Sequence, residues 1–249
     1  MLSTARSEPK RALIIDPTAH AAQNAPTQAT HTAQATHTAQ QSLDEAVVSV
    51  GVAAMIVLVL GGTRSGKSSV GTQIAADLAA GDLGEQVTFL APAMVDSGDS
   101  NYAARVAAHQ ASRPSHWRTV ECETPGDLPD LLVSCPSVVL LDSLGTWVAS
   151  HALVDTSSGV QAGFDAKAQL DVHFELLVKS LKERSQATVI VSEEVGMSVH
   201  APTELGRRYT DAVGTLNQQV AALAHKVLFV MAGRVLELPA SYQATRAST

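Results

Sequence analysis

Short runs of apolar residues alternate along this chain with segments whose apolar residues recur every three or four positions. Runs of the first kind are typical of buried parallel strands, and they lie at 55–60, 87–91, 138–142, 187–192, 226–231 and 234–238, with a further extended stretch at 116–121. Helical spacing is found at 69–80, 103–110, 170–184 and 203–225. This alternation predicts an α/β fold with a mostly parallel sheet, flanked by helices, that binds ligands at the carboxyl ends of its strands.

Two connections between these segments lack such spacing. The first follows the second predicted strand and spans about 92–100. The second begins after Asp142 and is polar, with many Ser and Gly residues. Both are predicted to be loops, because these residue types favour turns over regular elements.

The first fifty residues have a different composition from the rest of the chain. Ala, Gln, Thr and His dominate there, and Ala29–Gln34 is repeated at once as Ala35–Gln40. Such a segment has too little apolar surface to offset the entropy lost on ordering. The predicted organisation is therefore a disordered N-terminal extension at 1–52, one domain at 53–240 and a short C-terminal tail at 241–249.

Charge and composition exclude several classes of protein. The formal net charge of −7 leaves no basic excess for a general nucleic-acid-binding surface. No apolar run is long enough to span a membrane, and the N-terminus lacks the pattern of a secretory signal. The two cysteines, Cys122 and Cys135, lie outside any metal-binding spacing and are predicted to be buried thiols in a reducing compartment. We therefore expect a cytoplasmic protein without a nucleic-acid partner or a membrane span.

The clearest chemical motif follows the first predicted strand. Residues 61–68 read Gly-Gly-Thr-Arg-Ser-Gly-Lys-Ser and fit G-x-x-x-x-G-K-[ST], the phosphate-binding P-loop. Backbone N–H groups of this turn, with the N-terminus of the next helix, form a concave site for phosphate oxygens. Lys67 would reach the β- and γ-phosphates, and the Ser68 hydroxyl would hold Mg²⁺. The predicted ligand is a nucleoside triphosphate, bound by Gly61, Gly62, Thr63, Arg64, Ser65, Gly66, Lys67 and Ser68.

A carboxylate ends the third of the apolar strands. In P-loop proteins an acid such as Asp142 at this place can position Mg²⁺, directly or through a bound water. The same residue type at a strand end also serves as a helix N-cap or as an ordinary loop acid. Asp142 is therefore a candidate for nucleotide and metal binding with a structural role as the alternative.

Six motifs in this order resemble the bifunctional adenosylcobinamide kinase/adenosylcobinamide-phosphate guanylyltransferase family. The similar segments are 61–68 (GGxRSGKS), 105–109 (R-[IV]-x-x-H), 113–121 (R-P-x-x-W-x-T-x-E), 140–144 (LL-[DE]-x-[LI]), 191–197 (V-[ST]-N-E-V-G) and 207–218 (R-x-x-x-D-x-x-G-x-x-N-Q). The resemblance covers about residues 55–238 and leaves the N-terminal extension outside. One P-loop indicates only a superfamily, whereas six motifs in register indicate a family.

The resemblance implies a P-loop NTPase fold of the RecA-like class and two reactions of cobalamin biosynthesis. In the first, ATP or GTP phosphorylates the hydroxyl group of adenosylcobinamide. Lys67, Ser68, Mg²⁺ and Asp142 would neutralise charge on the transferred phosphoryl group. In the second, a histidine attacks the α-phosphate of GTP, expels pyrophosphate and passes GMP to adenosylcobinamide phosphate, which gives adenosyl-GDP-cobinamide.

Position within the second motif makes His109 the implied nucleophile. Imidazole suits this role because it is nucleophilic when neutral near pH 7. His116 is a competing histidine, but it falls at a variable position of the third motif. Arg113 and Glu121, from that same motif, complete the implied nucleotide-binding residues. Family members form trimers, so the resemblance also implies a homotrimer.

This chain departs from the family pattern in two places. Ala91-Pro92 and Asp99–Tyr102 stand where the family has Ala-Thr and D-x-E-M, which changes the contacts available to that loop. Glu193 replaces the usual Asn beside Glu194 and adds a negative charge near a strand end. Neither change alters Lys67 or His109, so both activities are expected.

Two alternative functions remain compatible with the residues themselves. One is a P-loop small-molecule kinase that has lost guanylyl transfer, in which the motif histidine would never become modified. The other is a nucleotide-dependent regulatory switch that acts through a partner protein and has no small-molecule substrate.

Overall fold

The computed structural model of this chain describes residues 55–80, 86–92, 114–157, 164–197, 199 and 201–240. The predicted terminal tails, the predicted helix at 103–110 and most of the loop predicted at 92–100 lie outside these residues. The strands are β1 (Ile56–Gly61), β2 (Val87–Pro92), β3 (Arg118–Cys122), β4 (Val138–Asp142), β5 (Thr188–Glu193), β6 (Lys226–Met231) and β7 (Arg234–Leu238). The helices are α2 (Lys67–Ala79), α4 (Leu128–Ser134), α5 (Leu144–Ser157), α6 (Phe164–Glu183) and α7 (Glu204–Ala221), with the 3₁₀ turn η2 (Pro125–Asp127) before α4.

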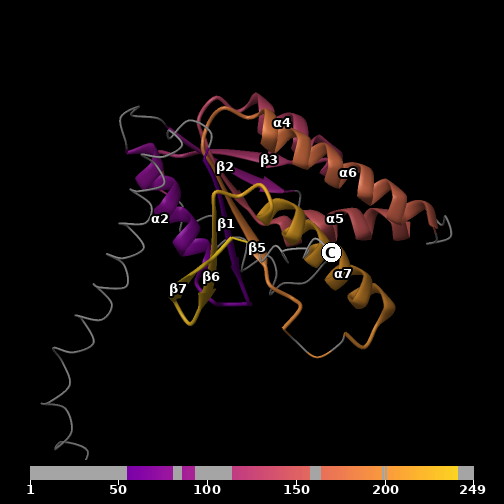
Figure 1. Ribbon diagram of the computed structural model, residues 1–249. Helices are drawn as coiled ribbons and strands as arrows, with labels where there is room; N and C mark the ends of the chain where they lie inside the picture. The colour runs from indigo at the N-terminus through magenta and orange to yellow at the C-terminus, as the bar shows by residue number, and fades with distance from the viewer. Residues whose placement is uncertain are drawn as a thin grey trace, which may run out of the picture.

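The described strands form one seven-stranded sheet in the order β3-β2-β4-β5-β1-β6-β7 (Figure 1). Neighbouring strands are parallel except β6 and β7, which form an antiparallel pair. All six residues of β1 are buried, as expected for a parallel strand covered on both faces. The carboxyl ends of β1, β4 and β5 therefore meet at one edge of the sheet, and the P-loop begins there.

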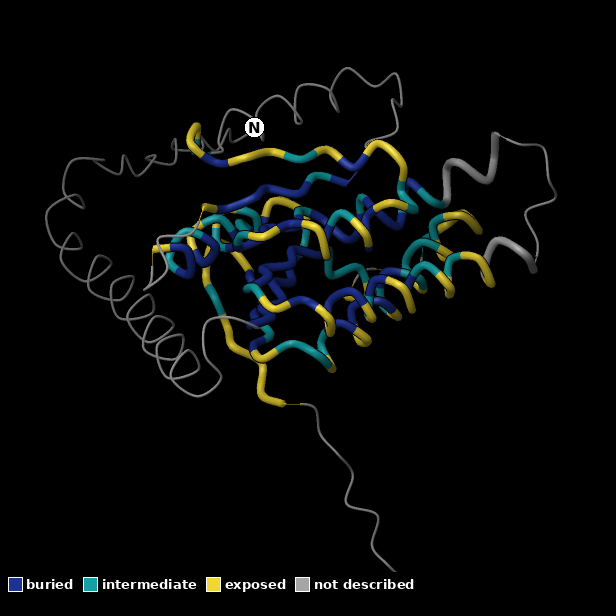
Figure 2. Tube along the Cα trace, turned by 90° about the horizontal axis from the view of Figure 1, so that it is seen from above, coloured by how far each residue is buried: buried dark blue, intermediate teal, exposed yellow. Residues whose placement is uncertain are grey.

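Of the described helices, α2 packs on one face of the sheet and α4, α5, α6 and α7 pack on the other (Figures 1 and 2). The alternation of side chains along β1 divides the core into these two layers. Val57 and Val59 pack with Ile74 of α2, whereas Leu58 packs in the layer that contains Trp147 of α5. The buried parts of the trace in Figure 2 follow the strands and the inward faces of the helices.

The predicted strands and their parallel arrangement are confirmed. The predicted helices at 69–80, 170–184 and 203–225 also form, with boundaries that shift by a few residues. The turn after α7 explains one such shift, because the His225 N–H already donates to the Ile56 carbonyl at 2.9 Å as the chain enters β6. The α4 helix was not apparent from periodicity, since seven residues give only two turns of pattern.

The predicted polar loop after Asp142 is wrong for residues 144–157, which form α5. Ser143 accepts a hydrogen bond from the Thr146 N–H at 3.3 Å, and the Ser150 hydroxyl donates to the Thr146 carbonyl at 2.9 Å. Trp147 is fully buried, and its Nε1–H donates to the Pro125 carbonyl at 2.7 Å. The hydroxyl groups that favoured a loop are thus satisfied by the helix backbone, while tertiary burial overrides local propensity.

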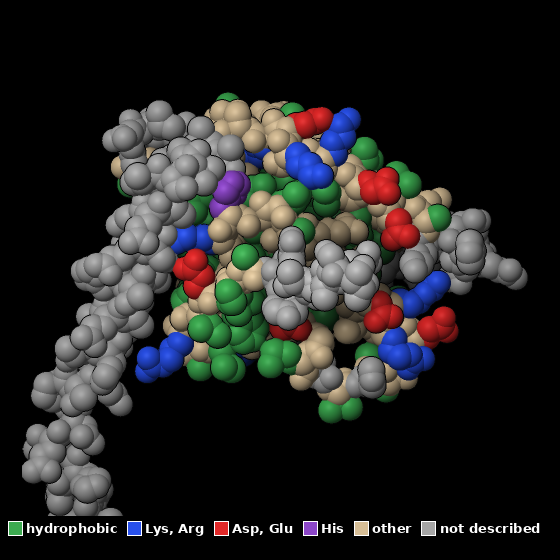
Figure 3. All heavy atoms as spheres, in the orientation of Figure 1, with side chains coloured by type: hydrophobic (Ala, Val, Ile, Leu, Met, Phe, Trp, Pro, Cys, Tyr) green, Lys and Arg blue, Asp and Glu red, His purple; other side chains and the backbone are tan. Residues whose placement is uncertain are grey.

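Both cysteines are buried thiols, as predicted. Within the described residues, no helix is both long enough and apolar enough to cross a membrane. On the face shown in Figure 3, hydrophobic side chains gather over β6 and β7. Met231, Leu236 and Leu238 are exposed there at the antiparallel edge of the sheet.

Candidate functional site

The loop between β1 and α2 has the backbone geometry that a phosphate-binding loop requires. Gly66 adopts φ +98° at the N-terminus of α2, a conformation that residues with a Cβ rarely adopt. A Cβ on Gly61 would lie 2.7 Å from the Val230 carbonyl oxygen, so only glycine fits between β1 and β6. The Gly233 N–H donates to the Ser65 carbonyl at 2.8 Å, which ties the loop to the β6–β7 turn.

The side chains of this loop differ in exposure. Thr63 and Arg64 are exposed, Ser65 is buried, and Ser68 is half-buried at the start of α2. Gly66, the N-cap of α2, provides no side-chain hydrogen bond to the first turn of this helix. Backbone N–H groups at an uncapped helix N-terminus favour an anion. The predicted phosphate-binding residues 61–68 are therefore brought together in one turn.

Lys67 lies close to an acidic side chain from the neighbouring strand. Its Nζ is 3.6 Å from Oε1 of Glu193 and donates to the Gly62 carbonyl at 3.4 Å. Glu193 ends β5 and is the register partner of Gly61 on β1. The Lys67 side chain is 11% exposed and that of Glu193 is 26% exposed, so this ion pair is largely shielded from solvent.

Residues from two other segments, the start of α5 and helix α7, surround the Glu193 carboxylate. The Ser143 hydroxyl lies 2.9 Å from Oε1 and 3.0 Å from Oε2. A Cβ on Gly145 would lie 2.0 Å from Oε2 and 2.7 Å from the Tyr209 hydroxyl, so glycine leaves room for both groups. Burial, and then the charge of Glu193, raises the pKa of Tyr209 to about 12. Tyr209 is therefore a neutral phenol beside the carboxylate at physiological pH.

Helix α7 also fixes the backbone of this strand end. The Asn217 side-chain amide donates to the Glu193 carbonyl at 3.0 Å, and its oxygen accepts from the Ser192 hydroxyl at 2.6 Å. The motif at 207–218 contains Asn217, but spacing alone gave it no role. Ser143 and Tyr209 were likewise not predicted as site residues, although both lie within motif segments.

The other predicted site residues lie at different distances from the P-loop. Asp142 ends β4 and is partly exposed at the same carboxyl edge, with β5 between its strand and β1. Glu121 lies on β3, the edge strand, and three strands separate it from β1. At roughly 4.8 Å per strand this is about 19 Å. His109 and Arg113 lie outside the described residues, and His116 is exposed next to Trp117.

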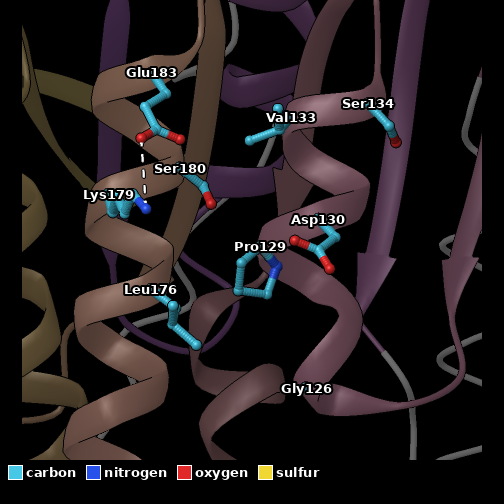
Figure 4. Close-up of a pocket in the computed structure, with 9 residues that line it drawn as sticks. All are labelled: Gly126, Pro129, Asp130, Val133, Ser134, Leu176, Lys179, Ser180 and Glu183. Carbon is cyan, nitrogen blue, oxygen red and sulfur yellow. Dashed lines mark ion pairs between the residues drawn. The ribbon is translucent and has the colours of Figure 1, made fainter.

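Two other features lie away from the P-loop. A groove of about 300 Å³ runs between α4 and α6 (Figure 4). Its lining includes Lys179 and Glu183, which pair with each other at 3.8 Å on the surface. It lies across the sheet from α2, and it gathers no group of catalytic side chains.

The second feature is a pair of histidines between α5 and α6. The ring centroids of His151 and His173 are 4.4 Å apart, with a tilt of 34°. His151 Nε2 and His173 Nδ1 are buried without a hydrogen-bond partner. Burial, and then the charge of His173, lowers the pKa of His151 to about 4. Within the described residues, these histidines do not belong to a group of three or more His, Cys, Asp or Glu side chains that could hold a metal.

Comparisons with known proteins agree with the motifs. The sequence profile of the family described as "Cobinamide kinase / cobinamide phosphate guanyltransferase" matches residues 57–238. The bifunctional adenosylcobalamin biosynthesis protein CobP of Pseudomonas aeruginosa is 35% identical over 184 residues, 73% of this chain and 95% of that protein. CobU of Salmonella typhimurium is 32% identical over 72% of this chain and 97% of its own length, and CobU of Escherichia coli is 33% identical over the same shares.

A solved structure of an ATPase from the type III secretion system of pathogenic bacteria aligns at a TM-score of 0.42 and 14% identity. It covers 71% of this chain and 51% of that one, a likeness too weak to add to the assignment. The family match, by contrast, runs from the second residue of β1 to the last residue of β7. The chain therefore belongs to the cobinamide kinase / cobinamide phosphate guanyltransferase family of transferases.

Proposed function

We propose that this chain works in cobalamin biosynthesis as a transferase with two successive reactions. ATP or GTP first phosphorylates adenosylcobinamide, and GMP from GTP is then transferred to adenosylcobinamide phosphate to give adenosyl-GDP-cobinamide. The observation that carries the proposal is a P-loop at the carboxyl edge of a parallel sheet, in a chain that belongs to this family.

In the kinase reaction, the substrate hydroxyl loses its proton to water and its oxygen forms a bond to the γ-phosphorus, while the bond from that phosphorus to the β–γ bridging oxygen breaks. The nucleoside diphosphate is the leaving group. Negative charge spreads over the oxygens of the transferred group in the transition state. The Lys67 ammonium and the uncapped N-terminus of α2 supply the compensating positive charge.

We assign Mg²⁺ to Ser68 and Asp142, with the carboxylate acting directly or through water. A hydroxyl and a carboxylate are hard oxygen ligands of the kind that Mg²⁺ prefers, and both side chains are partly exposed at the carboxyl edge. No group of three or more His, Cys, Asp or Glu residues in the described part of the chain could hold a metal. Phosphate oxygens and water would therefore complete the coordination. When bound, the ion supplies charge neutralisation on the nucleotide phosphates.

For guanylyl transfer, we propose His109 as the nucleophile, with Arg113 and Glu121 as nucleotide-binding residues. An imidazole nitrogen forms a bond to the α-phosphorus of GTP and pyrophosphate leaves. A phosphate oxygen of the second substrate then attacks the same phosphorus and the nitrogen–phosphorus bond breaks. Because three strands lie between β3 and β1, Glu121 would contact the nucleotide used in guanylyl transfer rather than one held at Lys67.

The intact mass of the purified protein after incubation with Mg²⁺ and GTP tests this assignment. Wild type is expected to gain one GMP that is lost in acid and stable in base, as a phosphoramidate is. His109→Ala should stay unmodified, and His116→Ala, the matched control, should be guanylylated like wild type. A wild type that neither gains mass nor releases pyrophosphate overturns the transferase proposal. A GMP on His116 would reassign the nucleophile.

We further propose, from the resemblance alone, that the chain is a cytoplasmic homotrimer. The proposed small-molecule partners are adenosylcobinamide, its phosphate, ATP and GTP. Light scattering coupled to size-exclusion chromatography tests the oligomeric state, and a mass other than about three chains overturns that part of the proposal.

A further inference from the structure

We propose that Glu193 is a positioning residue of the nucleotide site: its carboxylate competes with the nucleotide's phosphates for Lys67 and so weakens the binding of nucleoside triphosphates. This inference rests on the proposed function, because it takes Lys67 to be the residue that binds the β- and γ-phosphates.

The first support is the place of the carboxylate. Glu193 is the register partner of Gly61, the first P-loop residue, and the Glu194 N–H donates to the Gly61 carbonyl at 3.1 Å. Oε1 of Glu193 lies 3.6 Å from the Lys67 Nζ. An anion is thus built into the neighbouring strand, within contact distance of the ammonium that a triphosphate needs.

The second support is that this carboxylate is held in place. Ser143, which is 4% exposed, contacts both carboxylate oxygens through its hydroxyl. The missing side chain of Gly145 provides the space in which Oε2 lies. Asn217 fixes the Glu193 carbonyl from α7. A carboxylate with these contacts cannot simply rotate away into solvent when a phosphate approaches.

Electrostatics then determine the sign of the effect. A triphosphate must take the ammonium from Glu193 and places its own negative charges near the same carboxylate. Limited solvent exposure strengthens both the lost attraction and the new repulsion. Glu193 could also favour binding by holding Lys67 in one rotamer before the nucleotide arrives. This gain is smaller, because it concerns the entropy of a single side chain. Glu193 should therefore weaken binding, and more so for GTP than for GMP, which has no β- or γ-phosphate.

The experiment compares Glu193→Gln and Glu193→Asn with wild type. Glutamine keeps the length and the hydrogen-bonding ability of the side chain, and asparagine is the residue of the family pattern. Glu183→Gln, which removes the same charge from a surface pair with Lys179, is the matched control. The dissociation constants of fluorescently labelled GTP, GDP and GMP are measured with Mg²⁺ by fluorescence titration. Thermal melting checks that each variant is folded.

Both Glu193 variants are expected to bind GTP about tenfold more tightly than wild type, GDP less so, and GMP within about twofold. The gain should shrink only slightly at high salt, because a pair that is largely shielded from solvent is screened less than an exposed pair. KM for GTP in the kinase reaction should fall in parallel, and Glu183→Gln should match wild type. A merely structural Glu193 would change all three nucleotides alike.

GTP affinity that is unchanged or weaker in both folded variants overturns the inference. If wild type still binds GTP and gains GMP, the proposed function survives that result. If wild type does not bind GTP, the proposed function fails, and the inference fails with it.

Discussion

Two nearly buried cations lie at opposite ends of the same strand. Lys67 is next to the carboxyl end of β5, and Arg184 precedes its amino end. The whole Arg184 residue is 6% exposed, and the Lys67 side chain is 11% exposed. Their burial is similar, yet their partners differ in kind and in distance.

Arg184 donates hydrogen bonds to four neutral acceptors at short range. Its guanidinium donates to the Cys135 carbonyl at 2.7 Å and to the Thr188 hydroxyl at 2.8 Å, and also to the Leu132 and Ser137 carbonyls. These acceptors lie at the end of α4, in the turn before β4 and at the start of β5. The side chain thus joins three elements and satisfies helix-end carbonyls that would otherwise be buried without donors.

Lys67 has longer contacts and a charged partner. Its ammonium is 3.4 Å from the Gly62 carbonyl and 3.6 Å from the Glu193 carboxylate. Contacts of this length are broken at a lower cost than four short hydrogen bonds. In this fold the structural cation Arg184 is held by fixed acceptors, whereas Lys67, which we propose to bind a nucleotide, keeps contacts that a ligand can replace.

The largest effect on stability is expected from Arg184→Met. The change leaves buried carbonyl groups without a donor and should lower the free energy of unfolding by about 3–5 kcal/mol. Arg184→Lys should restore little of this loss, since an ammonium cannot reach acceptors in three directions as the planar guanidinium does. Urea denaturation followed by circular dichroism measures both variants.

Arg184 therefore has a structural role and no role in nucleotide binding. Folded Arg184→Met protein should therefore bind GTP with the affinity of wild type. A variant with wild-type stability but weakened nucleotide binding would reverse the assignment of the two cations.

Lys67→Met should give the opposite pattern. Loss of the ammonium removes charge stabilisation of the transferred phosphoryl group, so kcat/KM of the kinase reaction should fall at least about 100-fold, or about 2.7 kcal/mol. The free energy of unfolding should change by less than about 1 kcal/mol, because Ser143 still hydrogen-bonds the Glu193 carboxylate. Steady-state kinetics and urea denaturation on the same preparation measure both effects. A large loss of stability in Lys67→Met would show that its contacts are as structural as those of Arg184.

The sequence predicted these two cations with unequal success. Lys67 belongs to a motif with fixed spacing and known chemistry. Its place after β1, at the carboxyl edge of the sheet, could therefore be predicted from the sequence. Arg184 could be predicted only as a basic residue at the end of a helix, because three of its acceptors are carbonyls about fifty residues away in the sequence. Backbone acceptors leave no trace in residue types. The role of Gly145 could not be predicted either, because it depends on where the distant Glu193 side chain lies.

The strands of the sheet were predictable because their residue types do carry the signal. Its apolar strands are buried on both faces, so composition alone reveals them. Helix α5 was not, because Ser143, Gly145 and Thr146 favour a turn locally. Packing of Trp147 determines its structure instead, and that contact is tertiary.

A smaller effect is expected where titratable groups are buried without partners. The pKa of His151 is lowered from 6.5 to about 4, first by burial and then by the charge of His173. Between these values the unfolded chain binds a proton that the folded chain does not. Stability is therefore fully present above pH 6.5 and falls as the pH is lowered toward 4. Solvent screening at a half-buried ring limits the loss to about 1–2 kcal/mol.

Urea denaturation at pH 7.5 and pH 5, for wild type and His151→Phe, measures this term. Phenylalanine keeps an aromatic ring against Trp147, which lies 4.9 Å from His151 between ring centroids, but does not titrate. The difference in unfolding free energy between the two pH values should be smaller in the variant. If the unfolding free energy changed equally with pH in both proteins, groups other than His151 would cause the loss of stability in acid.

The smallest effect is expected from the pair Lys179 and Glu183, beside the α4–α6 groove (Figure 4). Their atoms are 3.8 Å apart, close to the Lys67–Glu193 distance, but the side chains are 68% and 55% exposed. Water competes for both charges, so Glu183→Gln should change the unfolding free energy by less than about 0.5 kcal/mol. The measurement is urea denaturation at low and high salt. If this variant lost as much stability as Arg184→Met, burial would have no effect on how much a charge contact contributes to the unfolding free energy. The expected small change means instead that burial and the kind of partner decide what a cation does in this fold.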